Sequence, residues 1–298
     1  MTTRLGPRRP SYPRMIRAGM SALGSRGSGP RPRKPPGRRG VLVLLASIVV
    51  LAAATVATVE MLPGRPGLLG QRCQAAFLPA FFSPGGWTQA VRSQPVPRTM
   101  ILDITTSGAG SAPEPAFQAA VKKAQAAGVT VLGYANTSFG ARPAAAVEQD
   151  VRNYKAWYGV TSILLDQAAA GAGKLGYYRQ LAGFIRSVDP GGAVWLNPGI
   201  YPDQRYMAIA SVVMAFEGPY SSYARLRVPS WADRYPAAKF AHTIYATPGS
   251  QLASALSLAR SRHAGWVFVT DRSGANPYDG LPGFWSRELA TIARGCNG

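Results

Sequence analysis

Eight short apolar segments recur along residues 75–270, and they constrain the fold more than any other feature of this sequence. Their first residues lie 18 to 32 positions apart, which is the length of one strand followed by one helix. Most of them are continuous apolar runs, as is typical of strands that are buried on both faces of a parallel sheet. The predicted strands span residues 75–81, 99–104, 130–134, 162–166, 193–197, 211–217, 241–245 and 265–270.

Helix-like segments fill most of the gaps between these runs. Apolar residues at helical spacing, with Pro or Gly at the boundaries, predict helices over residues 113–127, 143–158, 175–188, 247–259 and 282–293. The stretch after Glu217 is irregular and aromatic, so we expect only a short or broken helix there. Eight strands that alternate with helices fit a closed (β/α)₈ barrel or an open doubly wound sheet. The count of eight favours the TIM-type barrel, and the sequence lacks the glycine-rich phosphate loops of nucleotide-binding open sheets.

The front of the chain predicts three segments that precede a domain over residues 73–298. Residues 1–40 are rich in Pro, Gly, Ser and Arg and carry 11 Lys and Arg without an acid, so we expect a disordered basic cytoplasmic arm. Residues 41–62 begin with 19 uncharged, mostly apolar positions, which predict a transmembrane signal anchor. A linker over 63–72 follows. The Arg excess before the span places the domain outside the cell. Cleavage of a signal peptide, which would release a secreted domain, is the alternative.

Charge and cysteine usage exclude several classes of protein. More than half of the formal net charge of +20 lies in the basic arm, so the folded part is only moderately basic and a nucleic-acid partner is not expected. Two Cys and two His exclude a disulfide-rich scaffold and a clustered zinc site, and we expect neither a metal nor a cofactor. A closed barrel brings its ends together, so we predict a disulfide between Cys73 and Cys296, with two unpaired thiols as the alternative.

Two acidic residues directly end predicted strands, Asp166 after the fourth and Glu217 after the sixth. The carboxyl ends of barrel strands carry the chemistry of this fold, and a carboxylate there is costly to desolvate unless it is paired or functional. Paired carboxylates suit glycoside hydrolysis, in which one acid protonates the leaving oxygen and the other attacks the anomeric carbon or activates water. A purely structural pairing of each acid fits the pattern equally well. The sequence has no G-x-S-x-G motif around a nucleophilic serine, which argues against a Ser–His hydrolase.

Polar and aromatic residues at other strand ends and loops are the candidate substrate-binding residues. Sugar hydroxyls need hydrogen-bonding partners, and sugar rings stack on aromatic side chains. The candidates are Gln167, Tyr134, Asn197, Tyr220, Asn276 and Tyr245. Trp195 lies within a predicted strand, so we expect it to belong to the core.

Several stretches carry a resemblance to a known family. They are PAFF (79–82), AAGVTVLGYANTSFGAR (126–142), VRNYKAWYGVTSILLD (151–166), YY (177–178), VWLNPG (194–199), VMAFEGPYSSY (213–223), HTIYAT (242–247) and VFVTDRSGANPYDGLPGFW (267–285). In these stretches the chain resembles the spherulation-specific family 4 (spherulin-like) proteins, which include fungal glycoside hydrolases that act on galactosaminogalactan. The resemblance implies a (β/α)₈ barrel with an acidic groove, and Asp166 and Glu217 match its catalytic acids. The family pattern after the fourth strand is Asp-Glu, whereas this chain has Asp166-Gln167.

The sequence therefore predicts a membrane-anchored extracellular glycoside hydrolase that acts as a monomer on an amino-sugar polysaccharide. Because Gln167 replaces an acid, a polysaccharide-binding protein with impaired catalysis is one alternative. A structural surface protein whose barrel only displays loops is the other.

Overall fold

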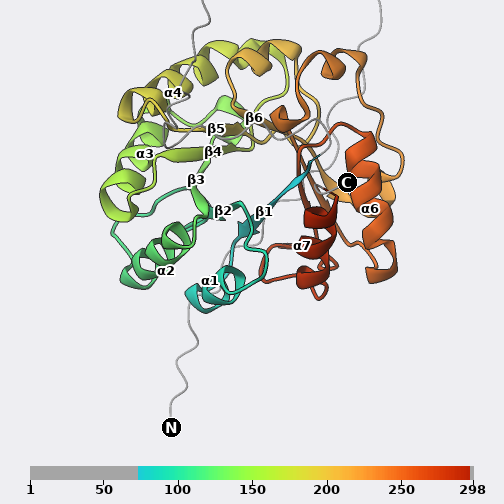
Figure 1. Cartoon of the computed structure of the whole chain (residues 1–298). Coiled ribbons are helices and arrows are strands. Elements are labelled where there is room, and N and C mark those ends of the chain that lie inside the picture. The colour runs from blue at the N-terminus through green and yellow to red at the C-terminus, as the bar shows by residue number, and fades with distance from the viewer. Residues whose placement is uncertain (1–72, 296–298) are drawn as a thin grey trace, which may run out of the picture. The chain divides into compact units, whose positions relative to one another are not determined.

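The computed structural model describes residues 73–295, and these form a closed barrel of eight parallel strands with helices around its outside (Figure 1). The strands pair in chain order, and β8 pairs back with β1, which closes the sheet. This confirms the predicted (β/α)₈ barrel. The strands are β1 (Ala75–Ala80), β2 (Thr99–Leu102), β3 (Thr130–Asn136), β4 (Ser162–Asp166), β5 (Val194–Leu196), β6 (Val212–Pro219), β7 (Phe240–Tyr245) and β8 (Trp266–Val269).

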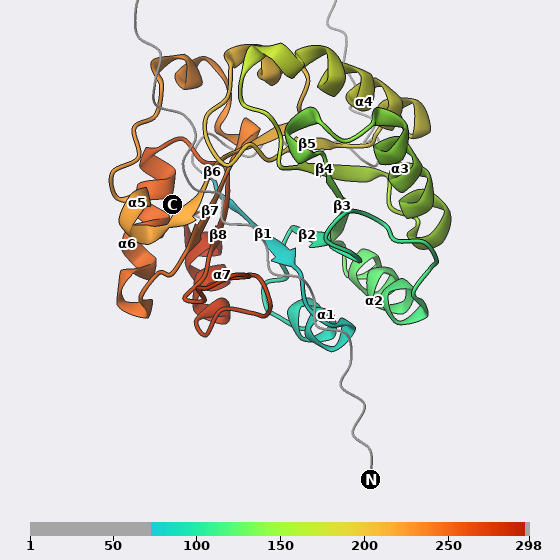
Figure 2. The ribbon, with the colours of Figure 1, turned by 180° about the vertical axis from the view of Figure 1, so that it is seen from behind.

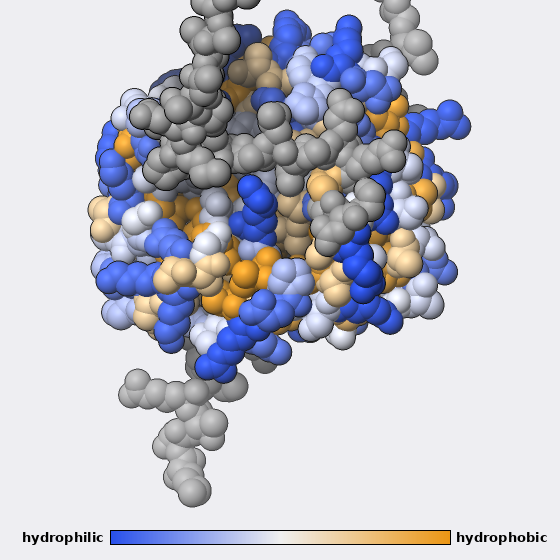
Figure 3. Space-filling view, viewed as in Figure 1, coloured by the Kyte–Doolittle hydropathy of each residue, from blue (hydrophilic) through white to orange (hydrophobic). Residues whose placement is uncertain are grey.

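The helices form an outer ring, which Figure 2 shows from the opposite side. Each of the longer helices buries an apolar stripe against the strands and exposes a polar face. Figure 3 shows hydrophilic residues along the edge of one face of the molecule. The helices are α1 (Pro84–Val91), α2 (Pro115–Ala126), α3 (Ala144–Tyr158), α4 (Leu175–Val188), α5 (Tyr220–Tyr223), α6 (Leu252–Ser261) and α7 (Trp285–Arg294).

Three connections differ from a strand followed by a long helix. The helix α1 was not predicted, because eight residues give only two turns and too few periodic positions; its buried residues are Trp87 and Ala90. Between β5 and β6 the chain forms only a 3₁₀ turn over Gln204–Ala208. After Glu217 the four-residue helix α5 is followed by two 3₁₀ turns, as the irregular sequence there predicted.

Aromatic rings fill the inside of the barrel. The Phe77 ring of β1 meets the Trp195 ring of β5 edge to face, with 5.5 Å between ring centroids, and lies 6.3 Å from the Phe268 ring of β8. All three residues are buried. Trp195 is therefore a core residue, as expected, and the barrel is packed and not a pore.

A β-bulge in β6 determines which way Glu217 faces. Met214 pairs with Ala241 of β7, but Phe216 pairs with the next residue of β7, His242, so Ala215 is an extra residue in β6. The extra residue reverses the alternation of side chains beyond it. Phe216 thus packs outward against His242, and Glu217 turns toward the mouth of the barrel.

Parts of the sequence prediction concern residues that the structure does not describe. The basic arm 1–40, the apolar segment 41–62, the linker 63–72 and Cys296 all lie outside the described range. Within residues 73–295, no helix is both long and apolar enough to cross a bilayer.

Candidate active site

A shared hydrogen-bond donor joins the two predicted acids. The side-chain nitrogen of Asn197, which follows β5, donates to Oδ1 of Asp166 at 2.7 Å and to Oε2 of Glu217 at 2.6 Å. Because one nitrogen contacts both oxygens, these two oxygens lie at most about 5.3 Å apart. The Oδ1 atom of Asn197 accepts from the Gly199 amide, which fixes the orientation of the side chain.

Two tyrosine hydroxyls complete the hydrogen bonding of the pair. Tyr134 of β3 donates to Oδ2 of Asp166 at 2.8 Å, and Tyr278, in the loop after β8, donates to Oε1 of Glu217 at 2.6 Å. The Phe81 ring, just after β1, packs edge-on against both tyrosine rings, with centroid distances of 5.5 and 5.6 Å. This arrangement fixes both carboxylates before any substrate arrives, which favours catalysis.

The surroundings of Asp166 favour its protonated form up to near neutral pH. Burial, together with the negative charge of Glu217, raises the pKa of Asp166 from its ordinary value of 3.8 to about 7. The hydrogen bonds from Tyr134 and Asn197 act in the opposite direction but do not cancel the effect. Asp166 is 8% exposed, whereas Glu217 is more accessible. A carboxyl group with a raised pKa beside a second carboxyl group can act as an acid while its neighbour acts as a nucleophile.

Gln167 follows Asp166 in a strained backbone conformation. Its φ is +47°, in the left-handed region that a side chain with a Cβ adopts only at a cost of about 1–2 kcal/mol. Its carbonyl accepts hydrogen bonds from the Thr137 hydroxyl at 2.9 Å and from the Phe139 amide at 2.7 Å. The loops after β3 and β4 are therefore joined beside Asp166. Strain of this kind concentrates at functional sites.

The remaining predicted binding residues lie on the same rim but differ in their contacts. Tyr245 ends β7, and its pKa is raised by burial and then by the charge of Glu217. Tyr220 donates from its hydroxyl to Oε1 of Gln251 at 3.1 Å. Asn276 accepts from the Tyr278 amide at 3.0 Å, so it shapes the loop that presents Tyr278 to Glu217.

Sequence reasoning did not include Tyr278 or Phe81 among the site residues. Tyr278 lies 61 residues from Glu217 along the chain, and only the closed barrel brings the loop after β8 to the end of β6. The sequence feature that could have indicated Tyr278 is Asn276-Pro277 directly before it, after the last strand. Asn side chains often accept a hydrogen bond from the backbone two residues on, which fixes the loop.

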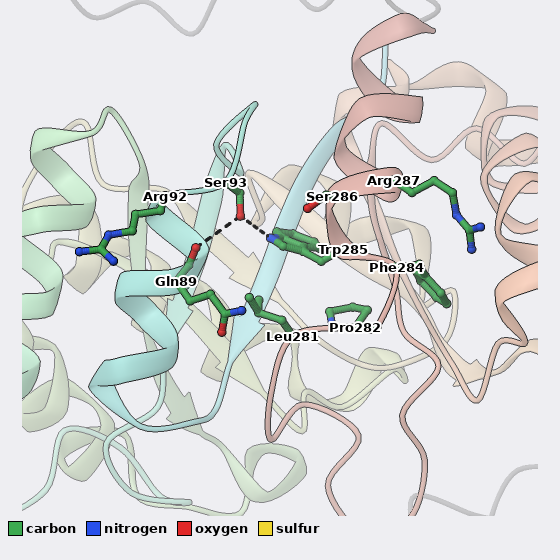
Figure 4. A pocket seen from close by; sticks show the side chains of 10 residues that line it. Gln89, Arg92, Ser93, Leu281, Pro282, Phe284, Trp285, Ser286 and Arg287 are labelled. Atoms are coloured by element: carbon green, nitrogen blue, oxygen red, sulfur yellow. Dashed lines mark hydrogen bonds between the residues drawn. The ribbon is translucent and has the colours of Figure 1, made fainter.

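A separate cavity lies on the outside of the barrel. It has a volume of about 670 Å³ and is lined by α1 and the start of α7 (Figure 4). The Trp285 indole donates to the Ser93 hydroxyl at 2.9 Å, and the side chains of Arg92 and Arg287 point away from the cavity. No acidic residue lines it. Among residues 73–295 no group of His, Cys, Asp and Glu is arranged to hold a metal ion.

The fold and the site define a (β/α)₈-barrel protein with a hydrogen-bonded pair of carboxyl groups at the carboxyl ends of its strands. The chain belongs to the spherulation-specific family 4, which matches residues 76–292. It is 30% identical to Spherulin-4 of Physarum polycephalum over 229 residues, which cover 72% of this chain and 69% of that protein.

Solved structures with a similar fold include the following two. Sph3 of Aspergillus clavatus, crystallised in complex with GalNAc, has a TM-score of 0.66 and 24% identity, covering 76% of this chain and 99% of that one. A chitinase of Chromobacterium violaceum has a TM-score of 0.51 and 10% identity, covering 74% of this chain and 99% of that one. These similarities show the barrel fold.

Proposed function

We propose that this protein is a glycoside hydrolase that cleaves a polysaccharide containing amino sugars, of the galactosaminogalactan type. The observation that carries the proposal is the Asn197 side chain, which holds Asp166 and Glu217 together at the ends of β4 and β6. Two carboxyl groups held this way, with the pKa of Asp166 raised to about 7, provide both the acid and the nucleophile that glycoside hydrolysis requires.

The spacing of the pair favours hydrolysis with retention of configuration. Retaining enzymes keep their two carboxyl groups about 5–5.5 Å apart, whereas inverting enzymes need roughly 6.5–9.5 Å to admit a water. The facing oxygens of Asp166 and Glu217 are at most about 5.3 Å apart. In the first step one carboxyl group protonates the glycosidic oxygen while the other forms a bond to the anomeric carbon. In the second step water breaks that bond, giving up a proton to the first group.

Two observations support an amino-sugar substrate. The first is that the match to the spherulation-specific family 4 covers residues 76–292, which contain both acids. The similar Sph3 structure from Aspergillus clavatus holds GalNAc, an N-acetylated amino sugar.

Gln167 supports a second candidate function, a polysaccharide-binding protein with impaired catalysis. It occupies a strained position directly after Asp166, and an amide can form hydrogen bonds but cannot deliver a proton. If catalysis needs a third acid at this place, the chain would bind the polymer without cleaving it.

We also propose that residues 41–62 anchor the protein in the cell membrane, with residues 1–40 in the cytoplasm and the barrel outside. The support is the uncharged apolar run together with 11 basic residues and no acid before it. Protease added to intact cells should then digest the barrel and spare the arm, whereas protection of the barrel would contradict this orientation.

The decisive experiment measures reducing ends released from purified galactosaminogalactan by residues 73–298, beside Asp166→Asn and Glu217→Gln. We expect the wild type to release them, and NMR of early products should show the anomeric configuration of the substrate. Each variant should lose on the order of 10²-fold or more, the contribution of a positioned acid or base. If the wild type binds the polymer without releasing reducing ends, the result favours the polysaccharide-binding protein. If it neither binds nor cleaves the polymer, the result contradicts both candidate functions.

A further inference from the structure

Only two large apolar side chains among residues 73–295 are exposed, and both lie beside the carboxylate site. Phe139 is 51% exposed and Ile200 is 59% exposed. Phe139 lies in the loop after β3 and Ile200 in the loop after β5, and these two strands flank β4, which ends in Asp166. Exposed apolar side chains that are confined to the rim of a polar site indicate contact with a ligand.

The backbone that carries Phe139 is strained and firmly held. Ser138 and Phe139 have φ values of +47° and +56°, so two successive residues with side chains adopt the left-handed conformation. The turn is held by hydrogen bonds from the Ser138 amide to Oδ1 of Asn136 and from the Phe139 amide to the Gln167 carbonyl, both at 2.7 Å. The Lys174 ammonium group donates to the next carbonyl, that of Gly140, at 2.9 Å.

Neither the strain nor the exposure of Phe139 helps the barrel fold. Strained backbone persists only where the surroundings fix it, and it concentrates at binding and catalytic sites. An aromatic side chain has only two rotatable bonds, so it loses little conformational entropy when a ligand covers it. Phe139 lies close to the site, because its own amide donates to the carbonyl of Gln167, the residue after Asp166.

We infer that Phe139 is a platform on which one sugar ring of the polysaccharide stacks, at a position next to the ring that is cleaved. This inference rests on the proposed function and adds to it a binding position at the β3–β4 side of the site. Pyranose rings have an apolar face of C–H groups, which suits an aromatic surface of this kind. Ile200, on the β5 side, has no ring and offers only apolar contact.

The test measures binding of galactosaminogalactan to the inactive double variant Asp166→Asn, Glu217→Gln by calorimetry, with and without further changes at Phe139. Phe139→Ala should weaken binding about tenfold, and Phe139→Trp should restore it to within about twofold. Ile200→Ala is the matched control, because it removes an equally exposed apolar group without a ring, and it should change binding less than threefold. Binding of free GalNAc should be unaffected by Phe139→Ala, because a single sugar occupies the cleavage position.

Stability provides a second readout that does not depend on activity. Phe139→Gly should melt no lower than the parent, because glycine accepts the left-handed conformation, yet it should lose as much affinity as Phe139→Ala. Equal binding by the parent and Phe139→Ala, or equal losses in Phe139→Ala and Ile200→Ala, would overturn the platform while leaving the proposed function intact. A parent that does not bind the polymer at all would overturn both.

Discussion

Asp166 and Glu217 accept hydrogen bonds from one and the same nitrogen, although they end strands that are not neighbours in the barrel. The intervening strand β5 supplies that donor through Asn197, which directly follows it. A single amide group therefore sets the distance between the two carboxyl groups and limits their mutual repulsion.

Removal of the shared donor should damage activity more than removal of either tyrosine hydroxyl. Asn197→Ala leaves both carboxyl groups without their common partner, so we expect kcat to fall at least 10²-fold. Tyr278→Phe removes one donor, from Glu217 alone, and should lower kcat less, by about 10-fold. Tyr206→Phe is the matched control, because its hydroxyl binds the Gly171 carbonyl outside the pair, and it should keep near wild-type rates. Equal rates for Tyr278→Phe and Tyr206→Phe would contradict a role for Tyr278.

Activity should decline as the pH rises through about 7. The pKa of Asp166 is raised to about 7 by burial and by the charge of Glu217, so Asp166 loses its proton near that pH. Without that proton Asp166 can no longer act as the acid that protonates the leaving oxygen. A profile of kcat/KM against pH measures this limb. An activity that stays constant to pH 9 would contradict the assignment of the proton to Asp166.

Asp166 should make the folded protein less stable as the pH rises from about 4 to 7. A carboxyl group whose pKa is raised on folding contributes stability that is present below pH 4 and is lost as the pH rises through the folded value. The shift from 3.8 to about 7 corresponds to roughly 4 kcal/mol at most. Urea unfolding should therefore show that Asp166→Asn gains stability relative to the wild type between pH 4 and pH 8.

A control with the opposite sign tests the same argument. Arg205 holds the pKa of the partly exposed Asp203 down to about 2, so Asp203 contributes stability above pH 4 that is lost as the pH falls through about 2. Asp203→Asn should thus be the less stable protein at neutral pH, and its deficit should shrink in acid. If both variants showed the same pH trend, the burial argument for Asp166 would not hold.

Gln167→Glu should separate a working hydrolase from a binding protein. If Asp166 and Glu217 suffice, a third carboxylate mainly raises the pKa of its neighbours, so the rate and pH optimum should change only modestly. If the third acid is essential, the wild type should be inert and Gln167→Glu should gain turnover. Initial rates on galactosaminogalactan for the two proteins distinguish these outcomes, and we expect the first.

Cys73 and Cys296 should form a disulfide. The residues adjacent to them meet at one side chain: Arg260 donates to Oε1 of Gln74 at 3.3 Å, and a Cβ atom built on Gly295 would lie 2.9 Å from the same Arg260 nitrogen. Closing a loop of more than 200 residues stabilises the fold by on the order of 4–5 kcal/mol in the chain-entropy view. Thiol labelling of the unfolded, unreduced protein should find no free thiol, and two labelled cysteines would contradict the pairing.

The sequence by itself determined the architecture of the barrel. Eight apolar runs at strand–helix spacing fixed the number and order of the strands, because a strand buried on both faces must be apolar throughout. The positions of Asp166 and Glu217 directly after such runs also placed both acids at the carboxyl ends of strands. The short helix α1 escaped prediction, because two turns leave no clear periodicity.

Only the tertiary structure decided how these residues work together. The extra residue Ala215 turns Glu217 toward Asp166, and a bulge depends on pairing with the neighbouring strand and not on local sequence. Tyr278 reaches Glu217 only because the barrel closes, bringing together groups 61 residues apart. The raised pKa of Asp166 likewise results from burial and from the nearby charge of Glu217. Local sequence patterns record which face of a segment is apolar, whereas distances between chemical groups arise when the strands are joined in three dimensions.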